Sequence, residues 1–341
     1  MPDPAEIDHA ARLLRAGRLV AFPTETVYGL GANALDAEAV ARIYGVKRRP
    51  ATSPLIVHVA SIEMAQSLVE DWPEIADRLA RRFWPGPLTL VLPKSHAGAD
   101  AFLRLRSGPA PAEQSSAAAS SSSLTIPAIV TAGLPTVGLR MPAHPIALAL
   151  IRAAGVPLAA PSANRFTELS PTTGDHVRLS LGSDIDYILD GGPCSVGIES
   201  TVLSLAEPGP TLLRPGGISR TELEAIVGPV ASAQEAQPGA HPSPGMHPRH
   251  YSPRTPLLLV KDGKLPGLGP GIYLQHQHLP SRESVQTIQM PTAAPDYAAA
   301  LYEILHQADA GNYDWIAVDL PPSTPDWEAV HDRLRRAASN S

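Results

Sequence analysis

Short apolar runs and stretches with helical spacing alternate along the first 230 residues of the chain. The apolar positions between Ile7 and Leu14 recur as they do on one face of a helix, which Gly17 can end. The run 18–22 is short and apolar, so it predicts a strand that Pro23 ends. Alternation of this kind is typical of an α/β or α+β protein rather than an all-α or all-β one.

The same alternation continues beyond this first unit. Helices are predicted at 37–44, where Asp36 can cap the first turn, at 73–83 and at 145–154. Strands are predicted in the apolar runs LIVHVA (55–60), LTLVL (88–92), PTVGLRMP (135–142), DYILDGG (186–192), STVLSL (200–205) and TLLRPG (211–216), and at the start of VPLAAPSAN (156–164).

Two stretches interrupt this alternation and divide the chain. Residues 106–127 are rich in Ser, Ala and Pro and predict a disordered insertion, whereas 230–256, rich in Pro, Gly and Ala, predict a linker. In the tail, 257–341, apolar runs alternate with helical stretches, which is typical of a small parallel, Rossmann-like domain. We therefore expect a larger domain at 1–229, a linker, and a small α/β domain.

Composition narrows the class of protein. The chain has 341 residues, 44% hydrophobic and 18% charged, which fits a soluble globular protein of two domains. A net charge of -6 argues against a broad nucleic-acid surface, although it leaves room for a local basic patch. No apolar run approaches the roughly 20 residues of a membrane helix. One cysteine, Cys194, and an N-terminus without signal-peptide order favour a cytoplasmic location.

Residues 29–34, GLGANA, match the glycine fingerprint of dinucleotide-binding turns. That fingerprint requires a strand directly before the first glycine, a helix at its end, and an acidic residue about 20 positions later. Here six residues separate Phe22 from Gly29, and VKRRP (46–50) carries no acid. We reject dinucleotide binding and expect the glycines to let the backbone turn and pack tightly.

Polar residues recur where the apolar runs end, which is where open α/β sheets bind ligands. Lys47 and Arg49 predict either a phosphate clamp or a solvated basic helix end. His58 alone would more often be a satisfied core histidine, and Ser162 and Asn164 could be turn formers or neutral donors to ligand oxygens.

Arg140 lies inside a predicted strand, so it needs a ligand or an ion-pair partner. The same choice arises at Ser200, Thr201 and Arg214, where a purely structural partner is the weaker explanation. Cys194 has no His/Asp arrangement near it in the sequence, so we reject a thiol nucleophile. Zinc is not expected either, because HPSPGMHPRHY (241–251) has neither companion cysteines nor an H-E-x-x-H helix.

Seven motifs occur together and in order: FPTETVYGLGANA, VKRRPATSPLIVHV, WPGPLTLVLPK, PTVGLRMPAHPIALALI, GVPLAAPSAN, GIESTVL and LLRPG. This set resembles the threonylcarbamoyl-AMP synthase family, the YrdC-like proteins. The linker motif PGMHPRHYSP, followed by a small α/β domain, is similar to the long, two-domain branch of the family. The resemblance is dense over residues 5–255, apart from the Ser-rich insertion, and looser in the tail.

The resemblance implies a fold and a reaction. The expected fold is a twisted, mostly mixed α/β sheet with a concave, positively charged cavity. In that cavity L-threonine, bicarbonate and ATP would form threonylcarbamoyl-AMP and pyrophosphate, with Mg²⁺ arriving on ATP. A separate enzyme would then transfer the product to tRNA.

The resemblance also implies roles for individual residues. Lys47 and Arg49 would be the catalytic cations that stabilise phosphate charge. The expected ATP contacts are Arg49, Ser53, Thr136, Ser162, Asn164, Ser170, Arg214 and Tyr251. The expected threonine contacts are Thr26, His58, Arg140, Ala160 and Ser200, with Arg140 facing the carboxylate.

Two other functions stay open from the residues alone. A binding module would hold RNA or a nucleotide in a basic groove without releasing pyrophosphate. A carbamoyl-adenylate-forming enzyme of the kind found within hydrogenase-maturation proteins is expected to carry cysteine-rich zinc segments, and this chain has one cysteine.

Overall fold

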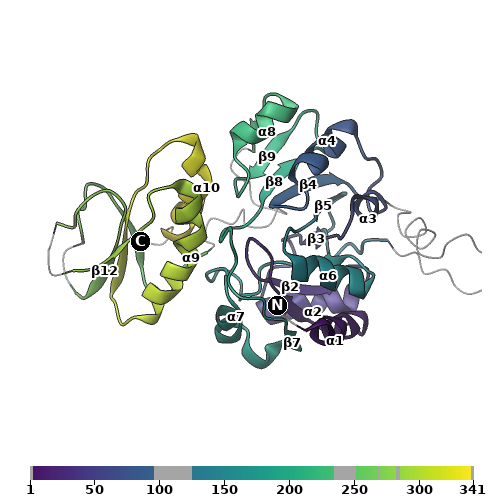
Figure 1. The fold of residues 1–341 in the computed structure, drawn as a ribbon, viewed down its shortest axis with the longest axis horizontal. Helices are drawn as coiled ribbons and strands as arrows, with labels where there is room; N and C mark the ends of the chain where they lie inside the picture. The colour runs from purple at the N-terminus through teal and green to yellow at the C-terminus, as the bar shows by residue number, and fades with distance from the viewer. Residues whose placement is uncertain (1–2, 96–124, 234–250, 267–268, 282–284, 339–341) are drawn as a thin grey trace, which may run out of the picture.

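The computed structural model describes residues 3–95, 125–233, 251–266, 269–281 and 285–338. Most of the predicted insertion, 106–124, and most of the predicted linker, 234–250, lie outside the described residues. The described elements form a larger and a smaller group, coloured purple to teal and green to yellow in Figure 1. Every described helix is too short or too polar to cross a lipid bilayer.

The larger group is built on a mixed sheet of ten strands. Its helices are α1 (Pro4–Arg15), α2 (Ala37–Lys47), α3 (Ile62–Gln66), α4 (Glu74–Phe83), α6 (Pro145–Ala154), α7 (Gly174–Ser180) and α8 (Arg220–Val227). Its strands are β1 (Val20–Phe22), β2 (Gly29–Asn33), β3 (Ile56–His58), β4 (Leu88–Pro93), β5 (Thr136–Arg140), β6 (Leu158–Ala159), β7 (Tyr187–Ile188), β8 (Thr201–Ser204), β9 (Thr211–Arg214) and β10 (Ala231–Ser232). The sheet order is β10-β9-β8-β4-β5-β3-β6-β2-β1-β7. The predicted mixed α/β sheet is confirmed.

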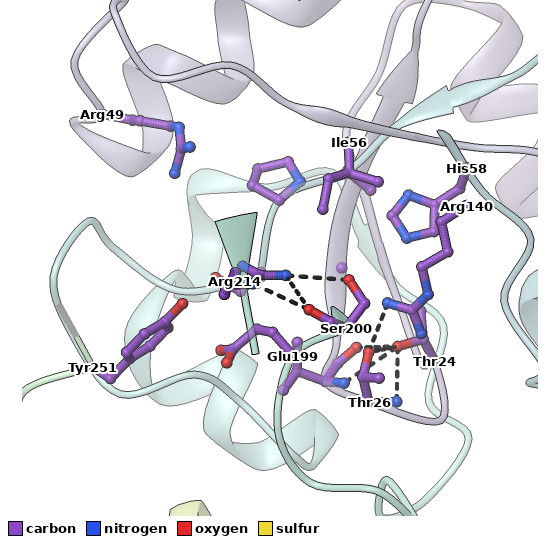
Figure 2. Close-up of a pocket in the computed structure, with 15 residues that line it drawn as sticks. Thr24, Thr26, Arg49, Ile56, His58, Arg140, Glu199, Ser200, Arg214 and Tyr251 are labelled. Atoms are coloured by element: carbon purple, nitrogen blue, oxygen red, sulfur yellow. Dashed lines mark hydrogen bonds between the residues drawn. The ribbon is translucent and has the colours of Figure 1, made fainter. Parts of the chain in front are cut away.

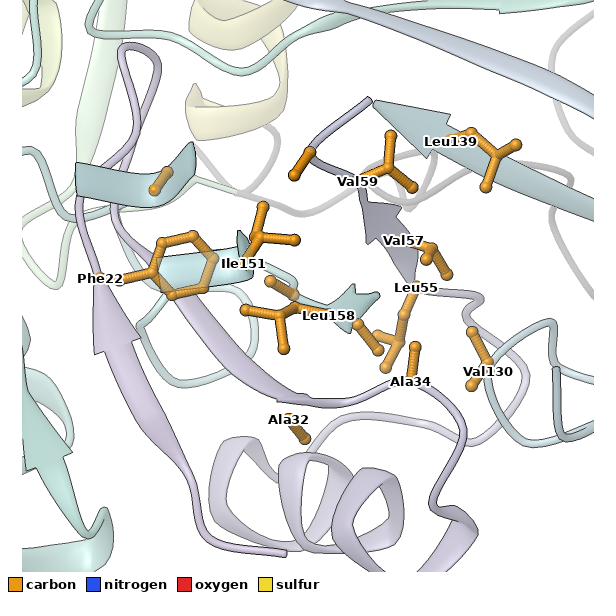
Figure 3. Packing of buried hydrophobic residues seen from close by; sticks show 14 of the residues in the cluster. Phe22, Ala32, Ala34, Leu55, Val57, Val59, Val130, Leu139, Ile151 and Leu158 are labelled. Atoms are coloured by element: carbon orange, nitrogen blue, oxygen red, sulfur yellow. The ribbon is translucent and has the colours of Figure 1, made fainter. Parts of the chain in front are cut away.

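Apolar side chains of the central strands form the core of this domain. Figure 3 shows Phe22, Val57 and Leu158 packed together with Ile151 of α6, and each is fully buried. Because side chains alternate between the two faces of a strand, the residues between these core positions face the other way. That alternation places His58 on the opposite face of β3 from Val57, where its ring lies edge-to-face with the Phe22 ring at 6.1 Å.

Local sequence signals explain where two helices begin and end. Asp3 and Glu6 form a capping box at the start of α1, and Asp36 accepts hydrogen bonds from the first turn of α2, as predicted. The helix α2 continues to Lys47, three residues beyond the prediction. Arg48 then ends it in a left-handed conformation with φ 53°.

The segment read as a glycine turn is a strand. β2 pairs antiparallel with β1, and Gly31 lies opposite Val20. A Cβ atom on Gly31 would come within 2.8 Å of the Phe22 ring, so no larger residue fits without movement. The expectation of close packing is confirmed. The expectation of a turn is wrong, because pairing with β1 keeps this segment extended although glycine has a low strand propensity, and the Phe22 ring leaves no room for a larger residue at Gly31.

The smaller group is a four-stranded parallel sheet with two long helices. Its elements are β11 (Leu257–Val260), β12 (Gly271–Gln275), β13 (Gln286–Gln289), α9 (Ala294–Ala310), β14 (Trp315–Asp319) and α10 (Glu328–Ala338), and the sheet order is β11-β14-β12-β13. All neighbouring strands run parallel. The predicted small α/β domain is confirmed, with β13 as a strand that the sequence did not indicate.

Candidate functional site

A polar cavity lies where several strands and loops of the larger domain end (Figure 2). Its lining comes from segments far apart in the chain, including the loop after β1, the ends of β3, β5 and β9, and the loop after β6. The lining residues are Thr24, Thr26, Val27, Gly29, Arg49, Ile56, His58, Arg140, Ala160, Pro161, Ser162, Glu199, Ser200, Arg214 and Tyr251. The cavity therefore brings together three arginines, two threonines, two serines and one carboxylate.

Arg140, at the end of β5, forms a buried ion pair beside the cavity. Its Nη2 donates to Glu25 Oε1 at 2.7 Å, and its Nη1 donates to Thr26 Oγ1 at 2.9 Å. The second oxygen of Glu25 accepts a hydrogen bond from the backbone N–H of Ala143 at 3.0 Å. Arg140 thus combines the two roles that the sequence left open, since it both pairs with an acid and lines the cavity.

His58, at the end of β3, is a neutral polar group in the cavity wall. Its side chain is buried, and Nδ1 has no hydrogen-bond partner among the described residues. Burial, and then the charge of Arg140, lower the pKa of His58 to about 3. The imidazole is therefore uncharged at neutral pH, and it can hydrogen-bond a ligand without adding charge.

Arg214, at the end of β9, fixes the segment before β8. Its Nη2 donates to the Ser200 carbonyl at 3.0 Å and to Ser200 Oγ at 3.1 Å. Ser200 Oγ also shares a hydrogen bond of 2.8 Å with Thr89 Oγ1. The orientation of the Ser200 hydroxyl is thus set by both neighbours.

Arg49 follows α2 and reaches the cavity from the opposite wall. Its Nη2 donates to Ser53 Oγ at 2.6 Å and to the Pro54 carbonyl at 3.0 Å. Burial lowers the pKa of Arg49 to about 10, which leaves the guanidinium charged at neutral pH. Ser53 does not line the cavity but holds the Arg49 side chain beside it.

Lys47 lies behind the cavity wall, and its side chain is only 1% exposed. Its Nζ donates to the Ser162 carbonyl at 2.6 Å and to the Asn164 carbonyl. Burial, and then the nearby Arg49 charge, hold the pKa of Lys47 well below its usual range. The amine therefore fixes the loop that presents Ser162 to the cavity.

Nine of the fourteen residues predicted for the site line the cavity: Thr26, Arg49, His58, Arg140, Ala160, Ser162, Ser200, Arg214 and Tyr251. Lys47, Ser53 and Asn164 lie directly behind it. Ser170 donates to Glu199 Oε1 at 2.5 Å, one layer further out. Thr136, at the start of β5, lines a separate small pocket with Pro54.

Tyr251, the first described residue after the linker gap, closes one side of the cavity. It is 1% exposed, and its backbone has φ 61°. Its ring lies 5.1 Å from the Arg333 guanidinium carbon and 5.9 Å from the Tyr302 ring, both in the smaller domain. The smaller domain therefore holds the tyrosine in place.

Sequence reasoning missed two buried carboxylates of this site, Glu25 and Glu199. Glu25 stands between two threonines directly after β1, and Glu199 directly precedes Ser200. An acid flanked by residues already assigned to a site was the available signal. Each carboxylate is paired with an arginine: Glu25 with Arg140 at 2.7 Å, and Glu199 with Arg333 at 2.6 Å.

A wider cleft of about 800 Å³ lies between the two domains at residues 195–198, 215–222 and the starts of α9 and α10. Its lining is mostly Pro, Gly, Ala and other small residues. Two of its charged groups, Arg220 and Glu328, pair with each other at 3.1 Å. Polar groups converge in the smaller cavity instead, and a ligand site needs such convergence more than volume.

The sequence matches two protein-family models. The model described as "Telomere recombination", for Sua5, YciO and YrdC proteins, matches residues 12–108 and 114–216. The model described as "Threonylcarbamoyl-AMP synthase, C-terminal domain" matches residues 218–339. Together they extend over both domains of the chain.

Individual relatives agree with these matches. The chain is 41% identical to the threonylcarbamoyl-AMP synthase of Bacillus subtilis, over 98% of this chain and 93% of the relative. It is 38% identical to that of Pyrococcus abyssi, over 96% and 93%. The solved structure of P. abyssi Sua5 complexed with L-threonine covers 99% of this chain and 95% of its own, at 35% identity and a TM-score of 0.83.

Proposed function

This chain belongs to the threonylcarbamoyl-AMP synthase family, in its two-domain branch, and we propose that the cavity of Figure 2 is the place where its reaction occurs. The substrates are L-threonine, bicarbonate and ATP, and the products are threonylcarbamoyl-AMP, pyrophosphate and the water lost when the amine and bicarbonate form the carbamate. The adenylate then serves tRNA modification by another enzyme, so we place the protein in the cytoplasm.

The observation that carries the proposal is the convergence of three buried guanidinium groups. Arg49, Arg140 and Arg214 enter one cavity from different elements, and each is at most 7% exposed. Burial of three cations is costly unless anions accompany them. Among the described residues, Glu199 lines the cavity and Glu25 pairs with Arg140 beside it, so three guanidinium groups are accompanied by two carboxylates. An anionic ligand accounts for the remaining positive charge.

We propose that threonine binds at the end of the cavity formed by Thr26, His58, Arg140, Ala160 and Ser200. Arg140 supplies the positive charge for the threonine carboxylate, and Glu25 holds that guanidinium in place. The threonine amine must be neutral to attack bicarbonate or CO2. A neutral His58 suits this step, because it adds no positive charge and can hydrogen-bond the substrate.

We propose that ATP occupies the other end, against Arg49, Ser162, Arg214 and Tyr251. The carbamate oxygen attacks the α-phosphorus, and pyrophosphate leaves. Arg49 and Arg214 stabilise charge on the phosphate oxygens, while Lys47 and Asn164 hold the loop that carries Ser162. Ser53 supports Arg49, and Ser170 supports Glu199, so both act from behind the wall. Thr136 remains a predicted ATP contact.

No covalent enzyme intermediate is needed for this reaction. The chain's one thiol, Cys194, is buried, and burial raises its pKa to about 12, so it does not form a thiolate nucleophile at neutral pH. Catalysis then consists of positioning and charge stabilisation. A closed Tyr251 wall also protects the carbamate, which water hydrolyses readily.

Mg²⁺ is proposed to arrive with ATP. No group of three or more Asp, Glu, His or Cys side chains within the described ranges could hold a metal ion. The carboxylates of Glu25 and Glu199 already accept hydrogen bonds from arginines. The triphosphate would therefore be the main ligand of the ion, as is common for Mg²⁺.

Pyrophosphate release from ATP and bicarbonate, with and without L-threonine, tests the proposal. Wild type should release pyrophosphate only with threonine. Arg49→Met should lower kcat/KM for ATP by roughly a hundredfold, because it removes a buried charged contact to phosphate. Arg48→Met is the matched control, since Arg48 is exposed and should keep wild-type rates.

Any of three results would contradict the proposal. Pyrophosphate release that does not depend on threonine would show that the assigned reaction is wrong. A wild-type rate for a folded Arg49→Met variant would show that the phosphates of ATP do not bind at Arg49. ATP or RNA binding without any pyrophosphate release would favour a binding module instead.

A further inference from the structure

Glu199 presents a carboxylate to a cavity that we assign to ATP. It is 6% exposed, it lines the cavity, and it directly precedes Ser200 (Figure 2). A carboxylate beside a triphosphate repels it strongly when little water separates the two. The site therefore needs a group that neutralises Glu199.

The partners of Glu199 come largely from the smaller domain. Arg333 Nε, on α10, donates to Glu199 Oε2 at 2.6 Å, and the Tyr302 hydroxyl, on α9, donates to the same oxygen at 3.1 Å. Burial alone would raise the pKa of Glu199, but the charges of Arg333 and Arg214 lower it overall. The carboxylate is thus ionised, and Arg333 is its direct counter-charge.

Arg333 is held in this position by its own neighbours. It is 1% exposed, and its Nη1 donates to Asp332 Oδ2 at 2.6 Å. Asp332 also accepts from Arg336 Nε at 2.9 Å. Since Asp332 shares its charge with two arginines, it does not cancel the effect of Arg333 on Glu199.

The backbone around Glu199 is also fitted to the smaller domain. Gly197 has φ 73°, and a Cβ atom there would lie 2.5 Å from the Ala299 carbonyl oxygen of α9. On the other side, a Cβ on Gly216 would lie 2.4 Å from the Glu199 carbonyl oxygen. The loop that carries Glu199 and Ser200 is therefore clamped between α9 and the segment after β9.

We propose that Arg333 is a positioning residue of the synthase site, which neutralises and orients Glu199 so that the cavity accepts the triphosphate of ATP. The smaller domain then contributes directly to nucleotide affinity. This inference rests on the proposed function of the cavity. Loss of Arg333 removes the ion-pair partner of the Glu199 carboxylate, whose repulsion of the triphosphate should then weaken ATP binding by roughly tenfold.

The experiment compares pyrophosphate release by wild type, Arg333→Met, Arg333→Lys and the double variant Arg333→Met/Glu199→Gln. KM for ATP should rise about tenfold or more in Arg333→Met. It should return toward wild type in the double variant, where no charge is left unpaired. Arg333→Lys keeps the charge and should stay closer to wild type than Arg333→Met. Glu328→Gln, which breaks another ion pair between the domains, is the matched control and should leave KM unchanged.

A merely structural role gives different results, because the double variant would then be no better than Arg333→Met. Such a failure to recover, or a wild-type KM in Arg333→Met, overturns the inference. If Arg333→Met does not fold, the double variant alone tests the inference. A KM for ATP of the double variant more than about threefold above that of wild type would then contradict it. Absence of threonine-dependent release from wild type would instead refute the proposed function.

Discussion

Replacing His58 with glutamine should remove a defined part of the pH dependence of folding. The His58 imidazole is buried at the end of β3, and burial and the Arg140 charge lower its pKa to about 3 in the folded chain. In the unfolded chain its pKa returns to about 6.5. Protons therefore bind the unfolded chain preferentially between these two values.

The sign and size of the change in stability with pH follow from this difference between the folded and unfolded pKa of His58. A histidine with a lowered folded pKa leaves stability intact above about pH 6.5, and stability is lost as pH falls toward 3. Between pH 7 and pH 5 the loss from His58 alone is about 2 kcal/mol, and below pH 3 it approaches about 5 kcal/mol. Glutamine has no titrating group, so the variant lacks this contribution.

Urea unfolding of wild type and His58→Gln at pH 7 and pH 5, followed by circular dichroism, measures the effect. The free energy of unfolding should fall by about 2 kcal/mol more in wild type than in the variant over this range. His9→Gln, at an exposed position of α1, is the control and should match wild type. Equal pH dependence in wild type and His58→Gln would refute a neutral, desolvated His58.

Two other substitutions test the geometry around the cavity. Arg140→Met should lower the free energy of unfolding in urea by about 3–5 kcal/mol, because Glu25 is left as a buried unpaired carboxylate. Adding Glu25→Gln should recover part of this loss. No recovery in the double variant would contradict the ion pair. Gly197→Ala should lower stability by about 1–3 kcal/mol in thermal unfolding, since alanine is strained at φ 73° and meets α9; an unchanged melting temperature would show that the domains are not in close contact there.

The fold could be predicted well where one local signal dominates. Asp36 and the apolar spacing after it were enough to place α2, but its end depended on Arg48 adopting a left-handed conformation. β2 could not be recognised, because Gly29 and Gly31 have low strand propensity and owe their place to the Phe22 ring. Such strands are determined by tertiary packing rather than by their own residues.

The family motifs predicted most of the cavity lining but not its acids, although Glu25 and Glu199 lie in two of the same motifs. Arg140 and His58 were found in this way, and both line the cavity. The acids were not found, because their meaning depends on distant partners. Glu25 pairs with an arginine 115 residues away and Glu199 with one 134 residues away. Nothing in either local sequence indicates those contacts.

The charge balance of the cavity supports the triphosphate site that we propose, even though the protein has a net charge of -6. The larger domain contributes three guanidinium groups, from Arg49, Arg140 and Arg214, and two carboxylates, from Glu25 and Glu199, which leaves one positive charge. In the smaller domain, Arg333 and Arg336 share the single carboxylate of Asp332, which leaves a second positive charge. Because these groups are buried, they are screened less than surface charges, so their local excess outweighs the overall negative charge. If ATP binds as we propose, the smaller domain supplies about half of the net positive charge around it, which is a physical reason for this domain to stay attached to the larger one.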